Sequence, residues 1–160
     1  MKKIFLMFVL AALLLTACAS NDNQMGGTDI QVNKPWARSA MMGANGAAYM
    51  LVQNRSNAED AIIGVSSDAA EAAEIHLSRM KADGTMEMTR QESIPLPAGG
   101  EVEFKPGSYH VMLIGLKREL KTGDKITLTL QFKNNEDVPL TIPVLDAEDM
   151  GGSGMDGHMP

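Results

Sequence analysis

A succession of short β-type segments, separated by turn residues, limits the fold of this chain more than any other feature. In residues 125–132 four apolar side chains alternate with polar ones, as in a strand with one buried face. Turn pairs such as Asp83-Gly84 and Pro106-Gly107 separate the segments. The other segments of this kind are 30–38, 47–54, 60–66, 72–78, 85–91, 100–104, 109–115 and 138–145. Many short strands at this spacing predict an all-β fold, a single-domain sandwich or Greek-key barrel.

One stretch departs from the β pattern. Residues 68–75 are rich in Ala and Glu, which favour helix over strand. We therefore expect a helical turn there, just before the strand that carries His76.

The N-terminal residues predict export and lipid anchoring. Lys2 and Lys3 precede an apolar run of the length of a signal peptide, too short to span a bilayer comfortably. The string Leu-Thr-Ala-Cys at 15–18 resembles a bacterial lipobox, in which Cys18 is lipidated after residues 1–17 are cleaved. The alternative is an ordinary cleaved signal that happens to contain a Cys. The lipobox interpretation predicts a protein anchored to a bacterial membrane, with its domain facing the periplasm or the cell exterior.

The mature chain divides into three parts. Residues 18–28 are polar and Gly-containing, and we expect a flexible tether. Residues 29–146 are predicted to form one β domain, within the size that a single core sustains. Residues 147–160 are mostly Gly, Asp, Met and His, and are predicted to be a disordered tail.

Charge and cysteine content exclude several functions. The chain has a formal net charge of −6 and no basic cluster, so nucleic-acid binding is not expected. The only cysteine is Cys18. A disulfide, a four-cysteine zinc site and a CxxC redox motif are therefore excluded, and so is a blue-copper centre if that Cys is acylated.

Histidine and methionine carry the candidate chemistry. The chain has 13 methionines but only three histidines. Alternate residues of a strand share a face, so His110 and Met112 lie roughly 6–7 Å apart at their Cα atoms, close enough to bind one ion. Met86 and Met88 share a face of an earlier strand, and His76 precedes them. If these segments are neighbours, His76 and one of the two methionines complete a site of two nitrogens and two sulfurs.

The types of donor atom in such a site determine which metal it prefers. Thioether sulfur is soft and uncharged, and selects Cu(I) over zinc, magnesium or calcium. The alternative is that each His and Met is structural, which is the commoner role of such a residue on a strand. The residues alone leave this open, as they leave open whether Met86 or Met88 is the ligand.

The segment from Glu74 to Val144 resembles the PCu(A)C family of periplasmic copper chaperones. That family's pattern is a His, an optional Met, ten residues, a Met, 21 residues, and His-x-Met. Here His76, Leu77 at the optional position, Met88, and His110-Val111-Met112 satisfy every spacing. Flanking strings are similar too: residues 73–76, 104–110, 115–117 and 120–124, with 36–38 and 46–49 resembling the N-terminal strands.

The resemblance implies a cupredoxin-like β-barrel that binds Cu(I) through His76, Met88, His110 and Met112. It further implies delivery of copper to an envelope protein such as the copper subunit of a respiratory oxidase, hence a role in cytochrome oxidase assembly. Met86 remains a candidate substitute or neighbouring residue. The tail is interpreted as a secondary copper-binding arm, with Cu(II) as a further candidate ion, or as solvated chain; its candidate ligands are Met150, Met155, His158 and Met159.

Four functions compete at this point. The first is a monomeric metallochaperone attached to the membrane by lipid, and the second is a copper buffer or resistance lipoprotein without a dedicated client. An enzyme is disfavoured, because no Ser-His-Asp arrangement or Cys nucleophile is evident and four protein ligands would fill the copper sphere. A structural or adhesive lipoprotein would bind no copper tightly.

Overall fold

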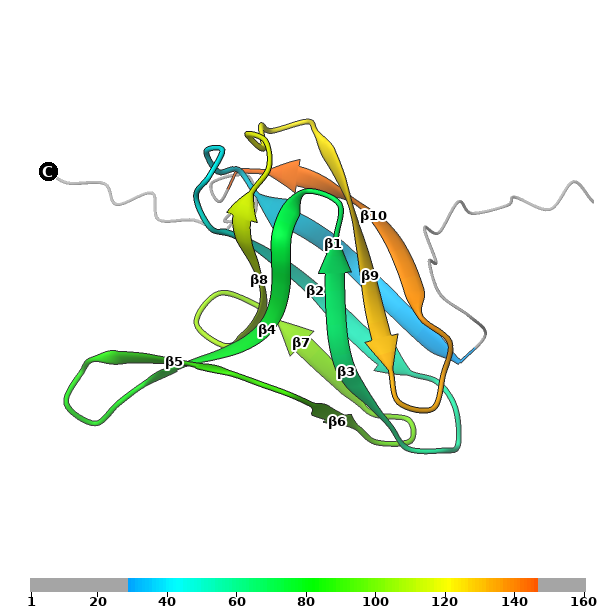
Figure 1. The fold of residues 1–160 in the computed structure, drawn as a ribbon. Coiled ribbons are helices and arrows are strands. Elements are labelled where there is room, and N and C mark those ends of the chain that lie inside the picture. Colours follow the sequence, from blue (N-terminus) through cyan, green and yellow to red (C-terminus); the bar gives the residue numbers. More distant parts are fainter. Residues whose placement is uncertain (1–28, 147–160) are drawn as a thin grey trace, which may run out of the picture.

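The computed structural model describes residues 29–146, which form ten strands joined by turns and loops (Figure 1). The predictions for the signal segment 1–17, the tether 18–28 with Cys18, and the tail 147–160 lie outside these residues. In the part described, no helix is long and apolar enough to cross a membrane.

The strands follow one another along the chain with few long gaps. They are β1 (Ile30–Arg38), β2 (Gly46–Asn54), β3 (Asp60–Ser67), β4 (Ala70–Met80), β5 (Met86–Arg90), β6 (Ile94–Leu96), β7 (Glu101–Phe104), β8 (Tyr109–Leu116), β9 (Lys125–Phe132) and β10 (Val138–Leu145). Their order in the sheet is β5-β4-β8-β7-β2-β1-β10-β9-β3-β6, and β8 also pairs with β2. The pairs β1–β10 and β7–β8 are parallel, and the other pairs are antiparallel.

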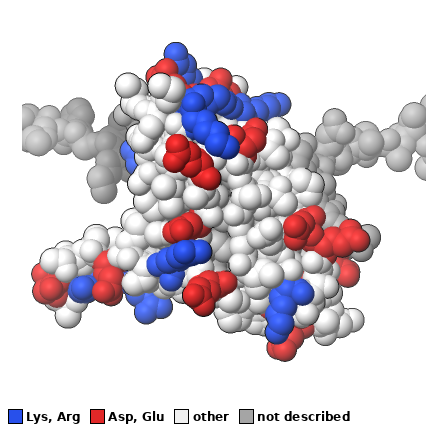
Figure 2. All heavy atoms as spheres, viewed as in Figure 1, with Lys and Arg blue, Asp and Glu red and all other residues white. Residues whose placement is uncertain are grey.

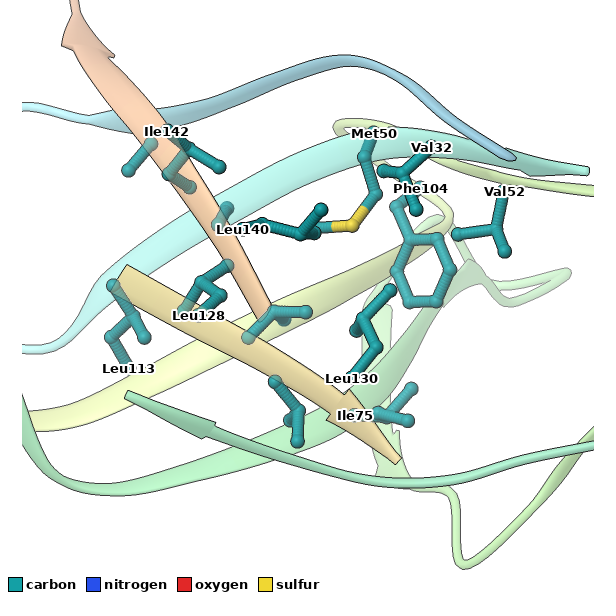
Figure 3. Packing of buried hydrophobic residues seen from close by; sticks show 14 of the residues in the cluster. Val32, Met50, Val52, Ile75, Phe104, Leu113, Leu128, Leu130, Leu140 and Ile142 are labelled. Carbon is teal, nitrogen blue, oxygen red and sulfur yellow. The ribbon is translucent and has the colours of Figure 1, made fainter. Parts of the chain in front are cut away.

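The core is mostly aliphatic and is formed by strands from both halves of this sheet order. Leu128 and Leu130 of β9 and Ile142 of β10 pack with Leu113 of β8 and Phe104 of β7 (Figure 3). The alternation predicted for 125–132 is confirmed, because the apolar residues of β9 are buried and Lys125 and Gln131 are exposed. Two curved layers folded over one such core are the all-β sandwich that the sequence predicts.

The helical turn expected at 68–75 is wrong. Ala70–Met80 is one continuous strand, paired with β8 from Ala70 opposite Leu116 to Leu77 opposite Tyr109. Helix propensity is a weak preference, and pairing with a buried central strand overrides it. A second difference is β6, which sequence analysis missed because it has three residues with Pro95 in the middle.

A β-bulge interrupts β1. The register with β2 shifts between Asn33 and Trp36, and Lys34 there has a φ of 47°. The extra residue lets Trp36 face Tyr49, with ring centroids 4.7 Å apart and both side chains buried. The bulge thus fixes the aromatic pair on the sheet that carries the candidate site.

Candidate metal centre

Three neighbouring strands bring the four predicted ligands to one face of the sheet. His76 of β4 is directly opposite His110 of β8, and Ser78 of β4 is opposite Met88 of β5. Met112 of β8 is opposite Glu74 of β4. Directly opposed residues share a face, and so do alternate residues along a strand. The histidines therefore form a central pair, with Met88 and Met112 on either side of it.

The two imidazole rings are close enough to bind one ion. Their centroids are 5.9 Å apart, with an angle of 47° between the ring planes. Ring nitrogens bind such metals at about 2 Å, which places two ligating rings roughly 5–6 Å apart at their centres. The His110 side chain is 7% exposed, so the pair lies at the edge of the core rather than in open solvent.

A backbone carbonyl fixes the proton on His110. Its Nδ1 lies 3.1 Å from the carbonyl oxygen of Ser108. A carbonyl only accepts, so Nδ1 carries the hydrogen and donates it. The Nε2 lone pair of His110 is left free to bind a metal.

Glu74 plays the same part for His76. The Nε2 of His76 is 2.9 Å from Oε2 of Glu74, whose other oxygen is 3.3 Å from Arg90 Nη1. The hydrogen bond from His76, aided by the charge of Arg90, lowers the pKa of the Glu74 carboxyl against the opposing effect of burial. An ionised carboxylate only accepts, so Nε2 of His76 carries the hydrogen and Nδ1 holds the lone pair.

That Nδ1 atom is buried, and it has no hydrogen-bond partner in the part of the chain that the structure describes. A buried polar atom of this kind is costly and calls for an explanation, such as an ion that it binds. Sequence analysis did not single out Glu74 as a partner of His76. Its position two residues earlier on the same strand was the available signal.

A hollow of about 290 Å³ lies against this face. Met88, His110 and Met112 line it, together with Ser78, Tyr49 and Arg38 among others. Burial raises the pKa of Tyr49 despite the nearby charge of Arg38, so the phenol stays neutral. His76 is not among the lining residues and faces His110 from beside the hollow.

Two further residues of the sequence pattern are placed elsewhere. Leu77, at the optional Met position, is buried and belongs to the opposite face of β4, away from His110. Met86 lies two residues before Met88 on β5, opposite Met80. The candidate tail ligands lie outside the described residues.

The donor set depends on sulfur. Within residues 29–146, no group of three or more His, Cys, Asp or Glu side chains is placed to hold a metal ion. Acidic and basic side chains are interspersed on the face seen in Figure 2, without one large basic patch. A soft cation therefore fits these residues better than zinc or a hard cation does.

Two solved structures with a similar fold contain copper. The copper-bound PCuAC domain from PmoF2 is 27% identical, with a TM-score of 0.64, over 77% of this chain and 97% of that one. The solution structure of CuI-DR1885 from Deinococcus radiodurans is 26% identical, with a TM-score of 0.53, over 79% and 86%. The class is thus an all-β, cupredoxin-like domain whose structural neighbours are PCuAC domains, and the predicted fold is confirmed.

The family follows from sequence comparison. The family model described as "Putative lipoprotein LpqE-like" matches residues 30–144, so the chain belongs to the LpqE-like family. "Putative lipoprotein Lxx21020" of Leifsonia xyli subsp. xyli is 32% identical over 73% of this chain and 70% of that protein. "Uncharacterized protein RP573" of Rickettsia prowazekii is 33% identical over 64% of this chain and 59% of its own length.

Proposed function

We propose that this protein is an exported, lipid-anchored Cu(I) metallochaperone of the bacterial cell envelope. It binds the ion through His76, Met88, His110 and Met112 and passes it to a copper-dependent oxidase or another envelope cuproprotein. Copper is its cargo, and the protein catalyses no reaction. Lipidation at Cys18 attaches it to the membrane, and the domain faces the periplasm or the cell exterior.

One observation carries the proposal: each histidine of the facing pair uses one ring nitrogen in a hydrogen bond and leaves the other ring nitrogen free to bind a metal. Ser108 holds His110 and Glu74 holds His76. Two thioethers, of Met88 and Met112, line the hollow beside them. The copper bound by the two structural neighbours, the PCuAC domain from PmoF2 and CuI-DR1885, supports the same choice of metal.

The ligand set suits transfer. Two imidazoles and two thioethers are uncharged, so they balance none of the charge of Cu(I) and hold it less tightly than thiolates would. Met88 is 53% exposed, which leaves one side of the ion open to an incoming ligand. An acceptor can therefore replace the protein ligands one at a time without the domain unfolding.

The test is an anaerobic titration of the mature protein with Cu(I) against a competing chelator. We expect one tightly bound ion and poor competition from zinc. Replacing His110 by Gln, or Met112 by Leu, should weaken Cu(I) binding about tenfold or more. Loss of a residue that only hydrogen-bonds a metal ligand already costs about tenfold, and loss of the ligand itself should cost at least as much. Met41→Leu is the matched control, because Met41 is 69% exposed and lies outside the hollow.

Delivery is tested by mixing the Cu(I)-loaded protein with the soluble copper domain of an oxidase subunit. A chaperone transfers its ion to this acceptor faster than to an unrelated copper-binding protein of equal affinity. Equal rates to both acceptors would favour the alternative, an envelope copper buffer or resistance lipoprotein without a dedicated client. Binding of Cu(I) that is unaffected both by His110→Gln and by Met112→Leu would contradict the site itself.

A further inference from the structure

The outer end of β4 and the whole of β5 form a hairpin that projects from the body of the domain (Figure 1). β5 is the edge strand of the sheet, and all five of its residues are exposed. The loop between the strands is closed by a hydrogen bond from Lys81 N to Thr85 O of 2.8 Å. The hairpin is therefore an ordered arm that meets solvent along its length.

Three methionines share one face of this arm. Met80 is directly opposite Met86, and the next pair inward on that face is Ser78 with Met88. Opposed residues have Cβ atoms about 5 Å apart, and successive pairs on one face are spaced by roughly 7 Å. The same face continues inward to His76, which is opposite Arg90.

These side chains fill no core. Met80, Met86 and Met88 are 71%, 55% and 53% exposed. Exposing three thioethers together on one face of a narrow hairpin gains nothing in packing, while the flexibility of Met lets all three sulfurs converge on one point. Three thioethers form a soft, uncharged donor set that suits Cu(I) and no hard cation.

The nearby charges do not oppose a cation on this face. Lys81 is 3.1 Å from Glu87, and Glu87 belongs to the opposite face of the hairpin. Arg90 shares the methionine face but is paired with Glu74. Arg79 is opposite Glu87 and so belongs, with it, to the other face. A Cu(I) ion at the methionines therefore meets neutral ligands, and the cation of its own face is paired with a carboxylate.

We propose that Met80, Met86 and Met88 form a second, weaker Cu(I) site on the hairpin, through which the ion leaves the His76–His110 pair. This rests on the proposed function, because Met88 is shared: it binds the ion at the inner site and turns outward to pass it to Met80 and Met86. Copper stays Cu(I) throughout, and thioethers neither gain nor lose a proton. The inner site alone has histidines, so it is the tighter of the two.

Methionine methyl NMR on the mature protein tests this residue by residue, with ¹³C-methyl Met and anaerobic Cu(I). The first equivalent should shift the methyl signals of Met88 and Met112. The second should shift those of Met80 and Met86 and move that of Met88 again. A Met80→Leu/Met86→Leu variant should keep the affinity for the first ion, lose the second response, and transfer copper to a small chelator severalfold more slowly.

The matched control is Met41→Leu/Met42→Leu, because these two methionines are equally exposed, at 69% each, in the loop between β1 and β2. It should behave as the unsubstituted protein.

If further copper leaves the Met80 and Met86 signals unmoved, the hairpin site is wrong while the inner site stands. Slower transfer to a protein client alone, with no shift of these methyls, would also overturn it and make the hairpin a docking surface. If Met88 and Met112 fail to respond to the first ion, the proposed function falls and the hairpin site falls with it.

Discussion

His76 shows how a single residue prepares this face for an ion. Its Nδ1 is buried without a hydrogen-bond partner among residues 29–146, while its Nε2 is held by Glu74. An unsatisfied buried polar atom costs about 1–3 kcal/mol. Under the proposed function, binding of the metal at Nδ1 removes that cost, and this gain adds to the copper affinity.

Glu74 provides the first test at this scale. Glu74→Gln keeps the shape of the side chain, but an amide can either donate or accept, so it no longer fixes which nitrogen of His76 carries the hydrogen. Partners of this kind are worth 10- to 100-fold in metal affinity, and we expect a loss of roughly tenfold for Cu(I) by chelator competition. Glu71→Gln, an exposed substitution on the same strand, should change nothing. Equal affinities for the two variants would show that Glu74 does not orient His76.

Asp60 provides a second test, in stability rather than binding. Burial raises the pKa of its carboxyl, but hydrogen bonds from Asn135, Ala61 and Asn134 outweigh burial and leave the pKa below its usual value. A lowered folded-state pKa stabilises the fold above the ordinary carboxyl pKa of about 4, and that stability is lost as pH falls through the folded value.

Asp60→Asn should therefore lower the free energy of unfolding at pH 7 by about 1–3 kcal/mol, because an amide group would face the donor of Asn135. The deficit should shrink on acidification through pH 4 and below. Urea unfolding at neutral and acidic pH measures both effects. A deficit that is the same at every pH would mean that the charge of Asp60 is not what the hydrogen bonds stabilise.

Among the elements, the bulge of β1 carries visible strain. Lys34 has a φ of 47°, which costs a residue with a Cβ atom roughly 1–2 kcal/mol. Gly adopts this conformation freely but loses about 0.5–1 kcal/mol through its flexible unfolded state. We expect Lys34→Gly to stabilise the domain by up to about 1 kcal/mol in urea unfolding. Lys34→Ala keeps the strain and should be nearly neutral. A glycine variant less stable than the alanine variant would contradict the left-handed backbone.

Strands with a clear alternation were predictable, and those set by tertiary pairing were not. β9 has its apolar residues at every second position, and its burial follows them. The first half of β4 has a helix-favouring composition, and only the partner strand β8 makes it extended. β6 is three residues long, too short for any period to show.

The candidate site was likewise predictable only in part. Spacing along one strand predicted that His110 and Met112 share a face, and the family resemblance supplied His76 and Met88. The register between strands was not available from the sequence. The position of Met80 opposite Met86, and of Met88 opposite Ser78, depends on where the Asp83-Gly84 turn closes the hairpin. A shift of one residue would have moved these side chains to the other face.

For the whole molecule, the proposed attachment to the membrane depends on Cys18, which lies outside the described part. Cys18→Ser should release the mature protein into the soluble fraction, because lipid is the proposed anchor and no helix of residues 29–146 can span a membrane. Fractionation of cells that express the protein measures this. Ser20→Ala, two residues after Cys18, is the control and should stay with the membrane. Unchanged partitioning of Cys18→Ser after cleavage would contradict the lipobox.

The course of β1 sets the distance between the start of the described domain and the proposed copper site. β1 begins at Ile30, and Arg38, at the far end of this nine-residue strand, lines the hollow beside the histidine pair. At about 3.3 Å per residue the two ends are roughly 25–30 Å apart. If Cys18 is lipidated as proposed, residues 18–28 add at most roughly 40 Å to that distance when fully extended. Under the proposed function, the length of this tether then limits which client copper centres in the same membrane the domain reaches. Lengthening the tether should then speed delivery to a client whose centre lies at the limit of this reach, and leave delivery to a freely diffusing client unchanged.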